Sequence, residues 1–143
     1  PREMHSACVL DNALFMAGGR KESGEVCGDL WKLDLISYKW TELPRLIKPR
    51  CAHVMDIYDQ GSKKYFLLDG GFDGAADIFD DIAVFDVIEN EWLKPTLKCK
   101  NNTRKFGHSS CISKDNKICF IGGVNFEKDL DDLCEIDPAY IIA

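Results

Sequence analysis

The sequence predicts an all-β fold built from three copies of one four-stranded antiparallel unit. A Gly-Gly pair ends an apolar run three times, and the three pairs are 52 residues apart (70 − 18 and 122 − 70). No segment shows the apolar period of a helix over three turns, whereas short β-rich runs bounded by turn residues recur along the chain. Each unit is therefore expected to be a sheet of roughly 50 residues, the size of one structural repeat.

The first two strands of each unit form a hairpin. The first strands read "HSACVL", "AHVMDIY" and "HSSCIS", and each begins at or next to a histidine that follows a basic residue by three positions. Turn residues come next, at Asp11-Asn12, Gln60-Gly61-Ser62 and Lys114-Asp115-Asn116. The second strands, in "ALFMAGG", "KYFLLDGG" and "ICFIGG", are near-continuous apolar runs, as expected for strands that are covered on both faces.

The third strands begin about eleven residues after each glycine pair and carry an aspartate in register. They read "LWKLDL", "IAVFDV" and "LCEIDP", and the fourth strands, "KWTEL" and "EWLKP", follow in the first two units only. Trp40 and Trp92 have no counterpart in the third unit, which is therefore expected to lack an ordinary outer strand. The predicted units span about 1–47, 48–99 and 100–143.

This order of features resembles the kelch repeat: Arg-x-x-His, an apolar strand, Gly-Gly, a loop, an apolar strand with Asp, and then Trp. Two copies read "PREMHSACVLDNALFMAGG…LWKLDL…W" and "PRCAHV…YFLLDGG…IAVFDV…W", and a third reads "RKFGHSS…ICFIGG…LCEID". The resemblance implies a partial kelch-type β-propeller of about three four-stranded antiparallel blades. The chain departs from the family pattern where a tyrosine is usual in the third strand, because Leu33, Phe85 and Ile136 stand there.

Residues that recur once per unit are expected to be structural. Glycine lets the backbone take a positive φ and approach a neighbouring strand, and tryptophan offers a large apolar area for a wedge between blades, although an aromatic ligand cage is an alternative. The expected structural residues are Gly18, Gly19, Gly70, Gly71, Gly122, Gly123, Trp40, Trp92, His5, His53 and His108.

Three blades do not close a ring, since propellers have four to eight. The chain starts with Pro1, not Met, so we expect it to be a piece of a longer propeller. We also expect this piece to self-associate in isolation, with two arcs making a six-blade ring.

Composition argues against several classes of function. The chain has 24 acidic and 18 basic residues, a net charge of −6, which disfavours nucleic acid as a partner. No apolar stretch approaches the ~20 residues that span a bilayer, so no membrane partner is expected. Seven cysteines contain no CxxC pair, which predicts free thiols, no zinc site and a cytoplasmic location, with the nucleus as an alternative.

No catalytic residue, metal or cofactor is expected. The three histidines recur as repeat features, and His108 with Ser109 is no catalytic pair because neighbours in a strand point to opposite faces. Cys8 and Cys111 share one repeat position, which indicates packing. The stretch "DGGFDGAADIFDD" lacks the spacing of an EF-hand and the Gly-Lys-Ser/Thr of a phosphate loop, although adventitious Ca²⁺ is an alternative.

Charged loops are the remaining candidates for function. In an up-and-down blade, the loops after the second strands and the links between blades emerge on one face. Three mostly acidic loops, "RKESGEVCGD", "FDGAADIFDD" and "VNFEKDLDD", would alternate there with links that hold Arg45, Lys48, Arg50, Lys98, Lys100, Arg104 and Lys105. The candidate partner-binding residues are Arg20, Lys21, Glu22, Arg50, Phe72, Asp73, Asp77, Phe79, Arg104, Asn125 and Phe126. The alternative is that these loops only keep the domain solvated.

The sequence therefore predicts a non-catalytic protein–protein interaction module, the kelch β-propeller of a larger adaptor or scaffold protein that binds a protein or peptide. The alternative is an accessory or regulatory propeller domain of a multidomain enzyme, such as a phosphatase, a methyltransferase or an oxidase.

Overall fold

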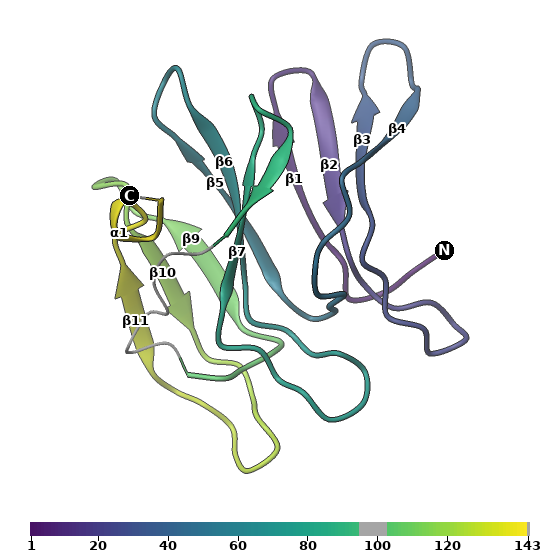
Figure 1. The fold of residues 1–143 in the computed structure, drawn as a ribbon. Helices are drawn as coiled ribbons and strands as arrows, with labels where there is room; N and C mark the ends of the chain where they lie inside the picture. Colours follow the sequence, from purple (N-terminus) through teal and green to yellow (C-terminus); the bar gives the residue numbers. More distant parts are fainter. Residues whose placement is uncertain (95–102, 143) are drawn as a thin grey trace.

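Three antiparallel sheets lie side by side in an arc in the computed structural model, which describes residues 1–94 and 103–142 (Figure 1). Blade 1 contains β1 (Ser6–Leu10), β2 (Ala13–Ala17), β3 (Leu30–Asp34) and β4 (Trp40–Leu43). Blade 2 contains β5 (Val54–Asp59), β6 (Lys64–Asp69), β7 (Ile82–Asp86) and β8 (Glu91–Leu93). Blade 3 contains β9 (Ser109–Ile112), β10 (Ile118–Ile121) and β11 (Leu133–Ile136), and the helix α1 (Ala139–Ile142) follows it. The predicted all-β fold is confirmed.

Each blade is a meander in which sequence neighbours pair, in the order β1-β2-β3-β4, β5-β6-β7-β8 and β9-β10-β11. The register repeats as well, because β1 pairs Ser6 with Ala17, β5 pairs Val54 with Asp69 and β9 pairs Ser109 with Ile121. Strands β1, β5 and β9 are neighbours in space and form the inner edge of the arc. The hairpins between strands lie at the upper end in Figure 1, and the loops after β2, β6 and β10 lie at the lower end.

We call the lower end the loop face. It consists of the loops 20–29, 72–81 and 124–132 and of the described parts of the links between blades, 44–50 and 103–105.

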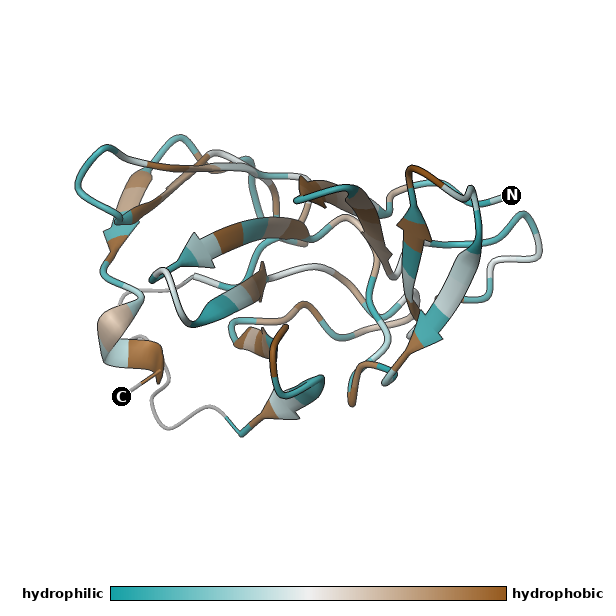
Figure 2. Ribbon diagram, turned by 90° about the horizontal axis from the view of Figure 1, so that it is seen from above, coloured by the Kyte–Doolittle hydropathy of each residue, from teal (hydrophilic) through white to brown (hydrophobic). Residues whose placement is uncertain are grey.

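Apolar side chains fill the spaces between blades. One cluster joins blades 1 and 2, where the rings of Phe15 and Phe66 lie 4.6 Å apart, and a second cluster around Leu67, Val84 and Phe120 joins blades 2 and 3. Seen from above, hydrophobic stretches follow the strands while most connecting loops are polar (Figure 2). Contact between the flat faces of neighbouring sheets is therefore the main source of burial.

The glycine pairs lie where one blade meets the next. Gly71 N–H donates to the carbonyl of Lys105 at 2.9 Å, and Gly19 N–H donates to the carbonyl of Arg50 at 2.9 Å, so each pair bonds to the backbone that opens the following blade. A Cβ on Gly70 would lie 2.6 Å from the Lys105 carbonyl oxygen and 2.8 Å from His108 Cε1. Gly70 also has a φ of 62°, a conformation that strains other residues. Both sterics and backbone geometry require glycine there.

The histidines complete the same junctions. His53 is buried and its Nε2 lies 2.6 Å from Ser6 Oγ of blade 1, whereas His108 Nε2 lies 2.9 Å from Asp69 Oδ2 of blade 2. Burial, and then the charge of Arg50, lowers the pKa of His53 to about 3. His53 is therefore neutral at pH 7. His5 holds the equivalent place in blade 1 and is exposed, because no described blade precedes it.

Two sheet faces are left uncovered within the described residues. The face of blade 2 that packs on blade 1 carries Ile57, Phe66, Leu68, Phe85 and Trp92. The equivalent positions of blade 1 are Val9, Leu14, Met16, Leu33 and Trp40, and all of them are half-buried or exposed. At the other end of the arc, Leu133 of blade 3 is 69% exposed, while its counterpart Ile82 is buried against blade 3.

The two repeated tryptophans differ in burial, because blade 1 covers the sheet face that carries Trp92, whereas no described blade covers the face that carries Trp40. The ring of Trp92 lies 5.0 Å from Phe85, and its Nε1–H donates to the carbonyl of Pro44 at 2.7 Å, so this side chain lies between blade 2 and the link from blade 1. Trp40 is 49% exposed and contacts Trp31 of its own blade at 6.5 Å. Trp40 is not a wedge between blades in the described part of the chain.

Blade 3 replaces the outer hairpin with a short helix. In all three blades an aspartate Oδ1 accepts the N–H of the residue two positions later, from Asp34 to Ile36, from Asp86 to Ile88 and from Asp137 to Ala139. The first two turns lead to β4 and β8, whereas Pro138 and α1 follow the third. Ile141 of α1 is buried in the cluster between blades 2 and 3.

We predict that Gly70→Ala lowers the free energy of unfolding by about 3 kcal/mol, because it adds a steric clash with blade 3 to backbone strain. Gly122→Ala is a matched control. Gly122 has a similar φ of 68°, but a Cβ there would meet only the Leu130 carbonyl oxygen at 3.5 Å, so about 1 kcal/mol of strain is expected. Urea denaturation measures both values, and equal losses would contradict the role assigned to the junction.

Candidate interaction surface

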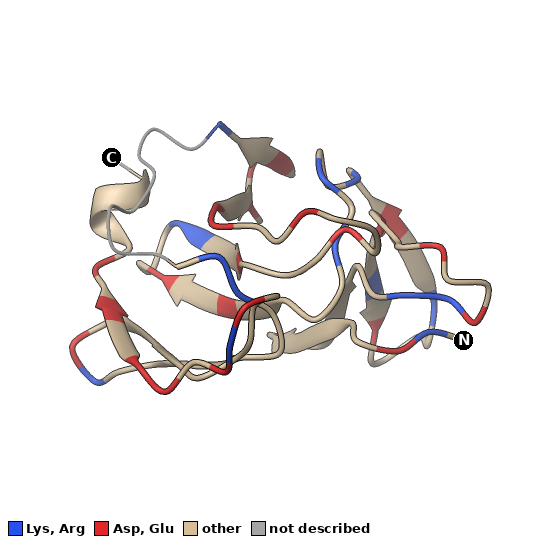
Figure 3. Cartoon of the chain, turned by 90° about the horizontal axis from the view of Figure 1, so that it is seen from below, with Lys and Arg blue, Asp and Glu red and all other residues tan. Residues whose placement is uncertain are grey.

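The loop face contains all the candidate partner-binding residues proposed from the sequence. Each of its three loops starts as a short antiparallel ladder: Arg20 bridges to Glu3 and Val26, Phe72 to Cys51 and Ile78, and Val124 to Phe106 and Asp129. Acidic and basic residues alternate along the chain over this face (Figure 3). The ladders fix the base of each loop in the same way, and the three loops differ at their tips.

Asp73 and Asn125 shape their own loops. Asp73 Oδ1 accepts the backbone N–H groups of Ala75, Ala76 and Asp77 at 2.8 to 3.0 Å, and these bonds lower its pKa. Asn125 Oδ1 accepts the N–H groups of Glu127 and Lys128, each at 2.9 Å. Both side chains therefore turn toward backbone, and their main effect is to hold the loop tips in place.

The basic residues of the first loop form ion pairs within blade 1. Arg20 lies 2.6 Å from Glu3, and Lys21 lies 2.9 Å from Glu25. Glu22 is exposed at the tip. The charges of Arg20 and Lys21 are therefore balanced within blade 1.

Arg50 requires a correction, because it is only 1% exposed and cannot present its side chain to a partner. Its Nη1–H donates to the Gly70 carbonyl at 2.9 Å, and its Nη2 lies 3.1 Å from Asp81 Oδ1. Arg2 does the same in blade 1, with the Gly18 carbonyl at 2.8 Å and with Asp29 at 2.7 Å. This buried ion pair joins the start of a blade to the loop after its second strand.

The sequence contained a signal for this ion pair. Asp29 and Asp81 are 52 residues apart, the same spacing as the glycine pairs. The hydrogen bond from Arg2 lowers the pKa of Asp29 well below its usual range. A basic residue and an aspartate that recur together at the repeat period indicate a structural pair.

The ring of Phe79 lies beside the basic residues that pair with Asp81. The Arg50 guanidinium lies 4.6 Å from the ring centroid and Lys48 Nζ lies 5.5 Å from it. Phe79, Asp77 and Arg104 line a shallow pocket of about 370 Å³ beside this ring. Arg104 is exposed there, with its Nε 3.6 Å from Asp80.

Three phenylalanines contact one another on the loop face, where blades 2 and 3 meet. The ring centroids of Phe72 and Phe106 are 5.4 Å apart, those of Phe72 and Phe126 are 5.8 Å apart, and those of Phe106 and Phe126 are 6.2 Å apart. Phe126 is 62% exposed. We call these residues the phenylalanine cluster. Phe106 was not among the sequence candidates, because Glu3 and Cys51 hold its position in the other blades and no repeat signal marks it.

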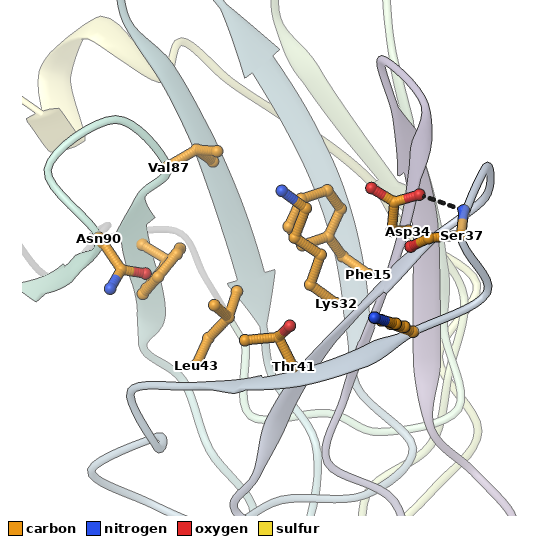
Figure 4. Close-up of a pocket in the computed structure, with 10 residues that line it drawn as sticks. Phe15, Lys32, Asp34, Ser37, Thr41, Leu43, Val87 and Asn90 are labelled. Atoms are coloured by element: carbon orange, nitrogen blue, oxygen red, sulfur yellow. Dashed lines mark hydrogen bonds between the residues drawn. The ribbon is translucent and has the colours of Figure 1, made fainter.

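A second groove, of about 510 Å³, lies between the upper parts of blades 1 and 2, away from the loop face (Figure 4). Phe15, Leu43 and Val87 line it together with Lys32, whose Nζ lies 5.9 Å from the Phe15 ring. Asp34 accepts the Ser37 N–H at 2.7 Å at its rim. No described histidine or cysteine lines this groove.

No group of three or more His, Cys, Asp or Glu side chains in residues 1–94 and 103–142 is placed to hold a metal ion. Burial raises the pKa of the Cys8 thiol to about 12, which keeps it protonated. No described helix is long and apolar enough to cross a membrane. Lys98, Cys99 and Lys100 lie outside the described residues.

Comparisons with known proteins agree with this architecture. A family model described as the KLHDC2/KLHL20/DRC7 Kelch-repeats domain matches residues 1–140. The F-box/kelch-repeat protein At1g51550 of Arabidopsis thaliana is 25% identical over 138 residues, which cover 86% of this chain and 28% of that protein. Kelch domain-containing protein 10 of Xenopus tropicalis is 44% identical over 61 residues, or 42% of this chain and 15% of that protein.

A further relative is the negative regulator of sporulation MDS3 of Candida albicans, which is 29% identical over 116 residues, or 65% of this chain and 8% of that protein. The chain thus spans less than a third of the length of each of these relatives.

We predict that Asp81→Asn lowers the free energy of unfolding by about 3 kcal/mol, because it leaves the buried Arg50 guanidinium without a carboxylate. Asp77→Asn changes an exposed residue of the same loop and should alter stability by less than about 0.5 kcal/mol. Urea denaturation of both variants tests this difference. A small effect of Asp81→Asn would mean that the ion pair does not hold the loop to the blade.

Proposed function

The chain belongs to the kelch-repeat family, and from this membership and the geometry of its loop face we propose that it is a non-catalytic protein–protein interaction module. The observation that carries the proposal is the phenylalanine cluster, in which Phe126 is 62% exposed and rests on the half-buried rings of Phe72 and Phe106. Exposed apolar side chains that gather at one place mark interaction sites, and aromatic side chains contribute strongly to binding.

We propose further that the module serves a larger adaptor or scaffold protein in the cytoplasm, with the nucleus as an alternative. The relatives support the first part, since each is several times longer than the segment that this chain matches. Cysteines without a CxxC pair support a reducing compartment. An accessory or regulatory domain of an enzyme is the competing role, and a catalytic domain in the same polypeptide would favour it.

We predict that changes on the loop face remove protein partners and that changes at the opposite end do not. The loop-face variant is Arg104→Glu with Asp77→Lys, two exposed residues that line the shallow pocket. The control is Lys63→Glu with Glu89→Lys, two exposed residues in hairpins at the upper end. Reversing a charge at an interface weakens association through repulsion, whereas a remote charge has no partner to repel.

Affinity purification from cells with quantitative mass spectrometry measures the effect. We expect the loop-face variant to lose co-purifying proteins at least about tenfold and the control to keep them. Loss with the control alone would place the interaction surface at the hairpins and overturn the proposal.

We also propose that this chain self-associates through its two uncovered sheet faces. The apolar face of blade 1 has the same residue pattern as the face of blade 2 that packs on blade 1, so it is shaped to receive a blade. The far face of blade 3 offers exposed Ile121 and Leu133 as its counterpart. Two copies joined head to tail at both faces would form a ring of six blades with two-fold symmetry.

Sedimentation velocity tests the second proposal. We predict a species of twice the 16.2 kDa chain mass, which Val9→Glu or Leu133→Glu converts to monomer, whereas Ile36→Glu in an exposed hairpin does not. A mixture of the two interface variants should still dimerise, because each retains the face that the other lacks. A wild-type monomer at micromolar concentration would overturn self-association.

A further inference from the structure

We propose that the phenylalanine cluster is the docking point for a basic peptide segment of the partner, one in which a bulky apolar side chain stands next to lysine or arginine. This inference deepens the proposed function and rests on it. It names the chemistry of the partner at one place on the loop face.

The cluster is not required by the repeated architecture. Side chains that the blades need recur at the same repeat position, as the glycine pairs and the histidines do. Phe72 has Arg20 and Val124 as its counterparts, Phe106 has Glu3 and Cys51, and Phe126 has Glu22 and Gly74. The three aromatic residues are thus particular to the junction of blades 2 and 3.

The cluster is also held in place before any partner arrives. Phe72 exchanges two backbone hydrogen bonds with Cys51, each at 3.0 Å, and Phe106 exchanges two with Val124 at 2.9 and 3.0 Å. Phe126 lies on the turn that Asn125 fixes. A partner that docks here therefore loses little entropy by ordering the site, and burial of the exposed ring gives a favourable contribution.

The charges around the cluster select the partner. The loops 72–81 and 124–132 contain eight acidic residues and one basic residue. Asp80 and Asp81 lie beside Arg104, Lys48 and Arg50.

The other acidic side chains of these loops, apart from the loop-capping Asp73, are exposed and form no ion pair with a lysine or arginine of residues 1–94 and 103–142. They are Asp77, Glu127, Asp129, Asp131 and Asp132.

These acidic residues lie on the same loops as the aromatic rings. Asp129 pairs in the ladder with Val124, which pairs in turn with Phe106. A cation placed beside Phe126 would interact both with nearby carboxylates and with the face of the ring. An acidic peptide or a nucleic acid would be repelled, and an apolar peptide without a cation would leave the carboxylates unused. The loop of blade 1 offers no such site, because ion pairs within that blade balance its charges.

A phage-displayed library of random 12-residue peptides, panned on the 143-residue chain, tests the inference. We expect the enriched peptides to carry net positive charge and a Leu, Met, Phe or Trp next to a basic residue. Synthetic peptides of the enriched sequences, labelled with fluorescein, then give affinities by anisotropy. Binding should weaken as NaCl is raised from 50 to 300 mM, because exposed charges are screened.

Variants locate the binding. Phe126→Ser should weaken these peptides about tenfold, and Asp129→Lys should weaken them and reduce the salt dependence. Both residues are exposed, so the fold should persist, and Ile36→Ser provides a control at an exposed apolar residue of the opposite end.

Enrichment of acidic or neutral peptides, failure to enrich any peptide, or affinities unchanged by Phe126→Ser would each overturn the inference. These results are distinguishable from failure of the proposed function. If the loop-face variant Arg104→Glu with Asp77→Lys still loses cellular partners, the interaction module stands and only the basic-apolar chemistry of the partner is wrong.

Discussion

The structure depends on one repeated junction. In it, a glycine pair of one blade contacts the backbone and the histidine at the start of the next blade. Gly71 N–H bonds to the Lys105 carbonyl, and the absence of a Cβ on Gly70 leaves room for the His108 ring. A second set of bonds runs through the same region, from Ala52 N–H to the Met4 carbonyl and from Gly107 N–H to the Ala52 carbonyl, each at 2.8 Å. These contacts fix the distance between blades, and the apolar faces then pack at that distance.

Much of this could be predicted from the sequence, because the junction and the strands repeat at a constant spacing. The apolar runs, the turn residues and the 52-residue period place the eleven strands of the described residues close to their observed positions. The short helix α1 could not be predicted, since four residues are too few to show a helical period. The helix forms where Asp137 starts the same turn as Asp34 and Asp86 but Pro138 follows.

The candidate interaction surface was predicted less well, because a charged residue looks alike in sequence whether it is buried or exposed. Arg50 stands in the same link as the exposed Arg45 and Lys48, yet it is buried and bonded to Asp81. Phe106 follows a basic stretch and has no aromatic counterpart in the other blades, yet it contacts Phe72 and Phe126 from distant loops. Contacts between loops of different blades depend on how the blades are arranged, and no local pattern encodes them.

Residues that repeat from blade to blade build the loop face, whereas residues that do not repeat are free to give it a specific function. Arg50, Asp81 and the glycines repeat. Arg50 and Asp81 join the start of blade 2 to its loop, and the glycines lie at the junction between blades, so a change at any of them costs stability before it alters binding. The three phenylalanines do not repeat, and their contacts across blades 2 and 3 are particular to this one junction. The exposed acidic residues of these loops form no ion pair with a lysine or arginine of the described residues. The stretch from Phe72 to Asp81 contains both structural and variable residues. Asp81 bonds to Arg50, and Phe72 belongs to the phenylalanine cluster. Blade 2 can therefore change its partner through the residues of this loop that precede Asp81, while Asp81 keeps the loop attached to the start of the blade.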